Sequence, residues 1–228
     1  MPKILSMGKL YLVRHGQASF GAADYDNLSA LGHKQSIRLG EYFASKGTRF
    51  DAVLTGTLKR HAQTYAGIAQ GAGMDLQPTL WPGLNEYEAE AVIAAIHPGP
   101  LEPPTTPDLY KLHFRLLRDG LTQWMNGVIT PKGMPTYDAF VQGITSALDH
   151  VRKQHTGDVL LVSSGGPIST AMGHILGTLP EKTIELNMQI RNSAVTEFLF
   201  TPKRHLLLSF NSLAHLDGAE YAPWTTYS

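Results

Sequence analysis

Residues 158–167 read DVLLVSSGGP, and this stretch sets the class of fold to which the rest of the chain must conform. A short apolar run that ends abruptly in small polar residues is typical of a buried β-strand with a polar exit. We therefore predict a strand over 158–163, followed by the turn Ser164-Gly165-Gly166. Pro167 is expected at the first position of a helix that ends near Gly177, because proline favours the first turn of a helix and glycine its end.

Strands and helices alternate on both sides of this stretch. Apolar runs predict further strands over 10–13 and 52–54 and a terminal pair over 195–200 and 206–210. Helical spacing of apolar residues predicts helices over 29–45 (N-cap Ser29, stop signal Gly47), 57–70 (N-cap Thr57), 92–96, 109–125 and 137–153.

This alternation predicts an α/β fold, a three-layer sandwich in which helices cover both faces of a mostly parallel sheet. The length fits one domain over residues 1–228, with an insertion at about 85–136 over one edge of the sheet. The proline-rich segment 98–107 falls inside that insertion and is typical of a surface linker.

Composition excludes several classes of function. Lys and Arg total 19, as do Asp and Glu, so the net charge is zero, which disfavours nucleic acid or an anionic membrane as a partner. The absence of cysteine excludes disulfides, thiolate nucleophiles and thiolate metal sites. No run approaches the roughly 18 apolar residues of a membrane span, and the start lacks the pattern of a signal peptide. We expect a cytoplasmic protein.

Three predicted strands end in groups that suit phosphate. These ends are Arg14-His15-Gly16, Thr55-Gly56-Thr57 leading to Arg60, and Ser164-Gly165-Gly166. Ligands of open α/β sheets bind at the carboxyl ends of strands, and helix N-termini favour anions. Each segment alone is more often a tight turn or a solvated edge, but their convergence predicts an anion site, most simply for phosphate.

The same segments resemble the motifs of the histidine phosphatase (phosphoglycerate mutase-like) superfamily. The resemblance begins with LVRHGQ at 12–17 and LSALGHKQ at 28–35, and it continues with VLTGTLKRHAQT at 53–64, LNE at 84–86 and VSSGG at 162–166. It implies the phosphoglycerate mutase-like form of the α/β sandwich.

The resemblance also implies a role for each matching residue. His15 would attack phosphorus and carry the phosphoryl group, with no metal or other cofactor. Arg14 and Arg60 would clamp the non-bridging oxygens, and Glu86 would protonate the leaving oxygen and then deprotonate water. Further phosphate contacts are expected from the loop residues Gly16, Gln17 and Gly165.

The chain departs from the family pattern at Ser164, where relatives usually carry a second histidine. Serine can still donate a hydrogen bond but brings no positive charge. His215, after the last β run, is a candidate for supplying that charge, although such a histidine is more often an edge residue. Other histidines are expected on the surface or in helix packing: His33, His61, His97, His113, His150, His155, His174 and His205. No base is evident beside Ser164.

These observations lead to a phosphatase acting on a small phosphorylated substrate or a phosphoprotein. A non-catalytic phosphate-binding module is the alternative, and a phosphoglycerate mutase is disfavoured because the missing histidine removes charge that a bisphosphate would need. The resemblance alone suggests a homodimer. The predicted insertion would roof the pocket with Tyr87, Tyr110, His113, Arg115 and Trp124.

Overall fold

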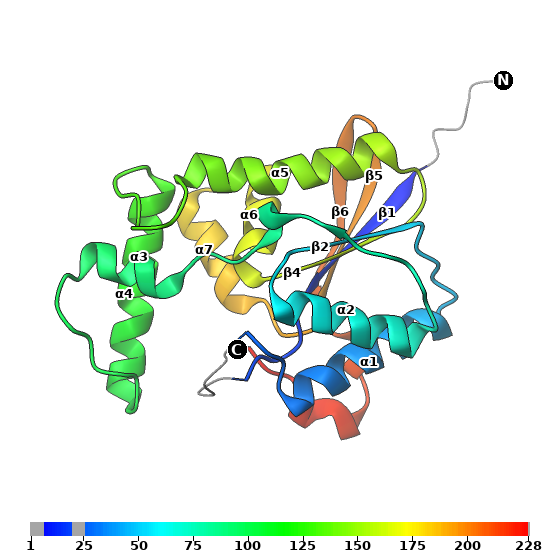
Figure 1. Ribbon diagram of the computed structural model, residues 1–228, viewed down its shortest axis with the longest axis horizontal. Helices are drawn as coiled ribbons and strands as arrows, with labels where there is room; N and C mark the ends of the chain where they lie inside the picture. The colour runs from blue at the N-terminus through cyan, green and yellow to red at the C-terminus, as the bar shows by residue number, and fades with distance from the viewer. Residues whose placement is uncertain (1–6, 20–25, 228) are drawn as a thin grey trace.

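The computed structural model describes residues 7–19 and 26–227, and its centre is a six-stranded sheet (Figure 1). The order across the sheet is β3-β2-β4-β1-β5-β6. The four strands β1 to β4 run parallel to one another, and β5 runs antiparallel to its two neighbours, β1 and β6. Their bounds are β1 Gly8–Arg14, β2 Ala52–Thr55, β3 Thr79–Leu80, β4 Val159–Ser163, β5 Val195–Thr201 and β6 Arg204–Ser212.

The predicted α/β sandwich is confirmed, with helices on both faces of this sheet. The helices are α1 Ala30–Ser45, α2 Lys59–Ala72, α3 Ala89–Ile96, α4 Pro107–Met125, α5 Tyr137–Gln154, α6 Gly165–Leu176 and α7 Pro180–Gln189. Short 3₁₀ helices cover Pro82–Leu84, Ala214–Leu216 and Ala219–Trp224. In the part of the chain that the structure describes, none of the helices is long and apolar enough to cross a membrane.

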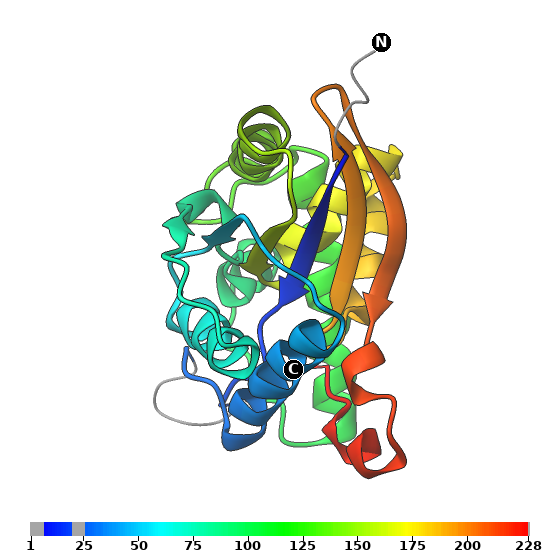
Figure 2. The same cartoon turned by 90° about the vertical axis from the view of Figure 1, so that its right-hand side faces the viewer.

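Alternation along β1 and β4 divides the core into two halves. Leu10 and Leu12 face α5 and α6, whereas Tyr11 and Val13 face α1 and α2. Successive side chains of a strand point to opposite faces, so a strand that is apolar throughout must be covered on both sides. Figure 2 shows β1, β5 and β6 side by side toward one edge.

The register of β1 against β4 positions the candidate site. Arg14 pairs with Ser163, so the next residues, His15 and Ser164, leave two neighbouring parallel strands at the same edge. β2 lies on the other side of β4, with Thr55 opposite Val162. The three predicted strand ends therefore meet.

Local signals explain the helix boundaries in two cases and fail in two others. Ser29 caps α1 by accepting from Gly32 N, and Gly47 follows with a φ of +66°. Thr57 is not the N-cap of α2, because it exchanges two hydrogen bonds with Asn85, and Leu58 takes that position. α6 begins at Gly165, so Pro167 is its third residue rather than its first.

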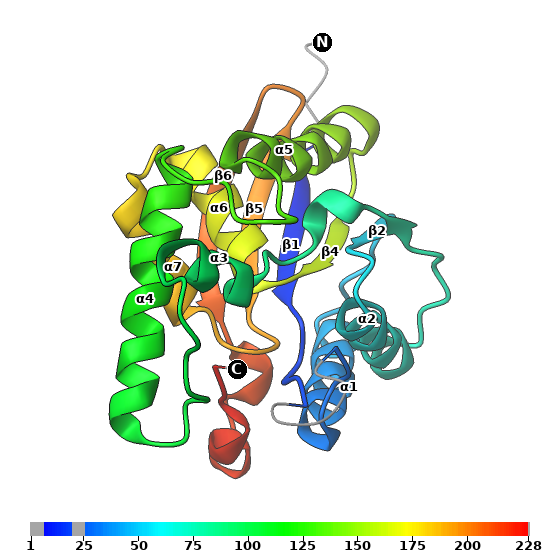
Figure 3. The same cartoon turned by 60° about the vertical axis from the view of Figure 1, so that its left-hand side comes forward.

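Helices α3 and α4 occupy the interval predicted as an insertion. They pack against each other, and α4 also contacts α7, beside the sheet rather than on it (Figure 3). Helix α7 has no counterpart among the helices predicted from the sequence, although Pro180 at its first turn and Glu181 beside it are ordinary signals of a helix start.

Candidate active site

His15 is the first residue after β1, and its own loop holds its ring. Its backbone N–H donates to Ser163 O over 2.9 Å, and Nδ1 lies 2.7 Å from Gly16 O. A carbonyl oxygen only accepts, so Nδ1 carries the hydrogen and Nε2 the lone pair. Burial and the charges of Arg14 and Arg60 lower the pKa of His15 well below its ordinary value. The ring is therefore a neutral imidazole, which is the nucleophilic form.

The two predicted arginines are fixed by different parts of the chain. The Arg14 guanidinium donates through one nitrogen to Ile190 O and to Tyr227 O, the latter over 2.9 Å. Arg60 is 8% exposed and lies in the first turn of α2. Arg14 adjoins His15 in the chain, and Thr64 Oγ1 accepts from Gly16 N while donating to Arg60 O, which joins the His15 loop to the start of α2. The predicted convergence of Arg14, His15 and Arg60 is observed.

Asp26 binds the start of α2 in the way an anionic ligand would. One carboxylate oxygen lies 2.8 Å from an Arg60 guanidinium nitrogen, and the other accepts from Lys59 N over 2.9 Å. Oxygen acceptors on an arginine and on a helix N-terminus are the contacts that a phosphate makes. These groups are thus arranged for a tetrahedral oxyanion.

Glu86 reaches the same region from the loop after the 3₁₀ helix Pro82–Leu84. Its carboxylate accepts from Gly166 N and from Tyr87 N, each over 3.2 Å. Burial raises the pKa of Glu86, and the Gly166 hydrogen bond and the two arginines oppose that rise. A carboxyl group with a raised pKa retains its proton better and suits a general acid.

The end of β4 and the turn after it hold the Glu86 segment in place. The Ser163 hydroxyl donates to Leu84 O over 2.6 Å, which fixes the segment that carries Glu86. A Cβ at Gly166 would overlap Glu86 and Tyr87, and one at Gly165 would lie 2.6 Å from Asn187 Oδ1. Gly166 is therefore needed for the close approach of Glu86 and Tyr87 to the N-terminus of α6.

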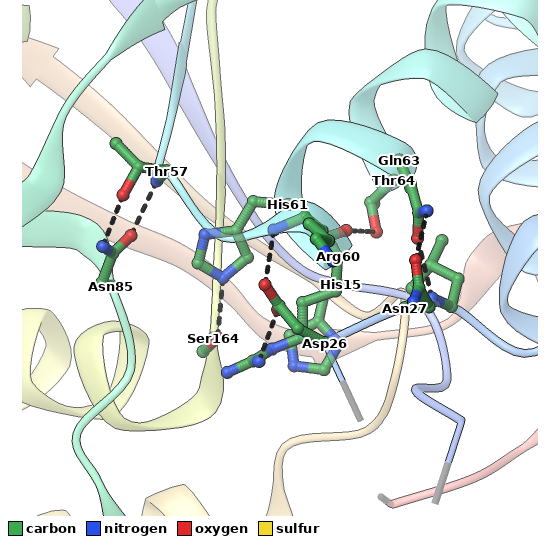
Figure 4. A network of polar contacts seen from close by, with 12 residues as sticks. His15, Asp26, Asn27, Thr57, Arg60, His61, Gln63, Thr64, Asn85 and Ser164 are labelled. Carbon is green, nitrogen blue, oxygen red and sulfur yellow. Dashed lines mark hydrogen bonds and ion pairs between the residues drawn. The ribbon is translucent and has the colours of Figure 1, made fainter. Parts of the chain in front are cut away.

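Ser164 has a histidine beside it, contrary to expectation, and that residue is His61. Nε2 of His61 lies 2.7 Å from Ser164 Oγ, and both side chains are fully buried. The ring of His61 is centred 5.9 Å from that of His15. Figure 4 shows His61 and Arg60 reaching the strand ends from consecutive positions of α2.

The assignment of His61 to the surface or to helix packing was therefore wrong. The available signal was its position directly after Arg60, because neighbouring residues in the first turn of a helix share its N-terminal end. Burial and the Arg60 guanidinium lower the pKa of His61 to about 3, so this ring is also neutral.

Gly16 and Gln17 hold the His15 loop in place. Gly16 N donates to Thr64 Oγ1 over 3.0 Å, and Gln17 N donates to Gln35 Oε1 over 2.8 Å. A Cβ at Gly16 would overlap the backbone of Gly32. The backbone N–H groups of both residues thus bind the protein, and a direct phosphate contact from this loop or from Gly165 stays a prediction.

His215 contacts Ser193 and α1. Its Nε2 is 2.9 Å from Ser193 Oγ, and its ring packs beside Tyr42 of α1. Burial and Arg38 lower its pKa to about 3. Within residues 7–19 and 26–227, no hydrogen bond joins His215 to Arg14, His15 or Arg60, so its compensating role gains no support from its contacts.

A cavity of about 300 Å³ opens beside Glu86, between the 3₁₀ helix Pro82–Leu84 and the segment leading into α5. No lysine, arginine or histidine lines it among the described residues. Tyr87 belongs to it, but Trp124 is buried in the core and Tyr110 is exposed. Its lining is Leu58, Pro82, Gly83, Asn85, Glu86, Tyr87, Glu88, Gly133, Met134, Pro135, Ala139, Phe140 and Gly143.

The profile of the histidine phosphatase superfamily (branch 1) matches residues 10–213. The chain belongs to that superfamily. Among its relatives, the broad-specificity phosphatase YOR283W of Saccharomyces cerevisiae is 31% identical over 85 residues, which span 34% of this chain and 37% of the yeast protein.

Solved structures of histidine phosphatase-like proteins share the fold. Bacillus stearothermophilus YhfR has a TM-score of 0.67 and 19% identity, over 91% of this chain and 98% of its own. Phosphoserine phosphatase from Entamoeba histolytica, solved with 3-phosphoglyceric acid, has a TM-score of 0.65 and 22% identity, over 92% and 99%.

Proposed function

We propose that this histidine phosphatase-like protein hydrolyses a phosphomonoester through a phosphohistidine on His15. The observation that carries the proposal is the 2.7 Å contact between His15 Nδ1 and Gly16 O. The Nδ1–H of His15 is bound by Gly16 O, so the lone pair is on Nε2, and two arginine charges lie close by. A neutral imidazole with a fixed tautomer beside two guanidinium groups suits nucleophilic attack on a phosphate dianion.

In the first half-reaction, the Nε2 lone pair forms a bond to phosphorus while the bond to the ester oxygen breaks. Glu86 donates its carboxyl proton to the departing oxygen, and the alcohol leaves. Arg14 and Arg60 balance the two negative charges of the phosphoryl group throughout. Catalysis of this kind depends mainly on positioning and electrostatic stabilisation.

In the second half-reaction, the Glu86 carboxylate accepts a proton from water. The water oxygen forms a bond to phosphorus as the phosphorus–nitrogen bond breaks, which restores neutral His15 and the protonated Glu86. Inorganic phosphate then leaves. The same carboxyl group thus serves as acid and base, and the pKa that burial raises favours its acid form before each cycle.

The cavity beside Glu86 is the natural place for the leaving alcohol. Its lining mixes apolar side chains such as Met134 and Phe140 with the carboxylate of Glu88. A second phosphate or a carboxylate on the substrate would find no cationic partner among the described lining residues. We therefore propose a neutral or cationic leaving group, which also counts against a phosphoglycerate mutase.

The direct test is to mix the protein with p-nitrophenyl phosphate, quench it, and locate bound phosphate by mass spectrometry. We expect phosphate on His15 that is labile in acid and stable in base, together with release of inorganic phosphate. Vanadate binding without turnover and without phosphohistidine would instead identify a phosphate-binding module. A substrate panel of aryl, alkyl and amino-alkyl phosphates, phosphoserine and 3-phosphoglycerate then tests the leaving-group preference.

A further inference from the structure

Position 164 is where the family resemblance places a second histidine, and the structure shows what stands there instead. Ser164 follows β4 just as His15 follows β1, and the two strands are parallel neighbours. A side chain at 164 is therefore adjacent to the phosphoryl acceptor. Serine is too short to fill the volume of an imidazole, so another group must occupy that space.

His61 occupies it, approaching from α2. Its Nε2 lies 2.7 Å from Ser164 Oγ, and its ring is centred 5.9 Å from the His15 ring with 38° between the planes. Gly56 makes room for this ring, since a Cβ at that position would overlap it.

Burial and a serine partner alone do not distinguish a catalytic histidine. His215 has the same features, with Nε2 on Ser193 Oγ and Nδ1 without a partner. The difference is location, because His61 adjoins His15, Arg60 and the N-terminus of α6. Ser164 is the N-cap residue of that helix, yet its hydroxyl makes no capping bond and faces His61 instead.

We propose that His61 replaces the missing second histidine, and that the His61–Ser164 pair donates a hydrogen bond to a non-bridging oxygen of the phosphoryl group on His15. Nε2–H of His61 donates to Ser164 Oγ, which directs the hydroxyl hydrogen of Ser164 toward that oxygen. This inference rests on the proposed function for its reaction and on the contacts above for its geometry.

A neutral donor is sufficient in this site. Once a phosphoryl group takes the place of the Asp26 carboxylate at Arg60, the charges of Arg14 and Arg60 match its two negative charges. Burial and Arg60 keep His61 uncharged before substrate binds. A preorganised neutral donor still stabilises the transition state, because it needs no reorientation when charge moves onto the phosphoryl oxygens.

The test compares two variants of similar volume and then moves the histidine. His61→Leu removes the donor, and we expect turnover of p-nitrophenyl phosphate to fall about 10²–10³-fold. His61→Gln retains a side-chain N–H donor near the position of Nε2, and we expect it to keep at least about a tenth of parental turnover. His33→Leu, on the exposed face of α1, is the control and should match the parent.

The double variant His61→Ala/Ser164→His places the imidazole at the position that relatives use. We expect it to exceed His61→Ala in turnover by at least about tenfold. Ser164→His alone should give no gain, because the His61 ring already fills the space and overpacking follows. If His61 had a purely structural role, a histidine at position 164 would not restore turnover, because the double variant still lacks the α2 side chain at position 61.

Three results would overturn the proposal. These are near-parental turnover of His61→Leu, a folded double variant no faster than His61→Ala, and acid-stable phosphate on Ser164, which would make Ser164 the nucleophile. If the parent itself is inactive, the proposed function fails. Vanadate affinity measured by calorimetry then decides this inference separately: about tenfold weaker binding by His61→Leu than by the parent supports it, and equal binding refutes it.

Discussion

Replacing Glu86 by glutamine should separate the two half-reactions. The contacts and the role of Glu86 set the expected loss of stability and the expected loss of rate. The two carboxylate oxygens accept from Tyr87 N and Gly166 N. A glutamine amide has one acceptor oxygen, so one backbone N–H loses its partner, which destabilises the fold by about 1–3 kcal/mol. One general acid–base group contributes about 10²–10⁴-fold to rate, and this is the loss expected for an alkyl phosphate.

The assay is stopped-flow hydrolysis of two substrates by Glu86→Gln. The nitrophenolate ion leaves without protonation, so His15 should still be phosphorylated quickly, while the second half-reaction lacks its base. We expect a stoichiometric burst of nitrophenol, accumulation of acid-labile phosphate on His15, and no burst with an alkyl phosphate. A thermal melt confirms that the variant is folded at the assay temperature. Equal losses on both substrates, without a burst, would refute the assignment of Glu86 as general acid and base.

Other predictions concern the remaining site residues. His15→Ala should abolish turnover, and retention of more than about a tenth of the parental rate would contradict a histidine nucleophile. Arg60→Ala should lose about 2–4 kcal/mol of transition-state stabilisation, with weaker inhibition by vanadate; unchanged inhibition would place Arg60 outside the site. The pH profile of kcat/KM should show no loss on acidification through pH 6.5, because the lowered pKa of His15 keeps its ring neutral there. Activity should fall at higher pH, because Glu86, whose pKa is raised, loses the proton that the leaving group needs. An acid limb near pH 6.5 would contradict this. His215→Ala truncates a buried side chain and should lower the free energy of unfolding, measured by urea denaturation, by about 2–4 kcal/mol. A loss of turnover of about 10²-fold without that destabilisation would support His215 as the compensating charge.

Elements whose signals are local could be predicted from the amino-acid sequence. The apolar runs at β1 and β4, the Ser29 cap of α1 and the paired terminal strands are each specified within a few residues, and the structure confirms them. Because parallel strands end at one edge of a sheet, the meeting of Arg14, His15 and Arg60 followed from those runs as well. The family motifs likewise indicated the superfamily to which the chain belongs.

The partner of Ser164, in contrast, depends on how distant elements pack together. His61 and Ser164 are 103 residues apart, and their contact depends on the rotation of α2, on the absence of a side chain at Gly56 and on the register of β4 against β2. The N-cap of α2 was decided in the same way, since Asn85 competes for Thr57 from 28 residues away. Periodicity and capping patterns report which face of an element is buried, but a hydrogen bond between distant side chains depends on how the elements pack, which no local pattern contains.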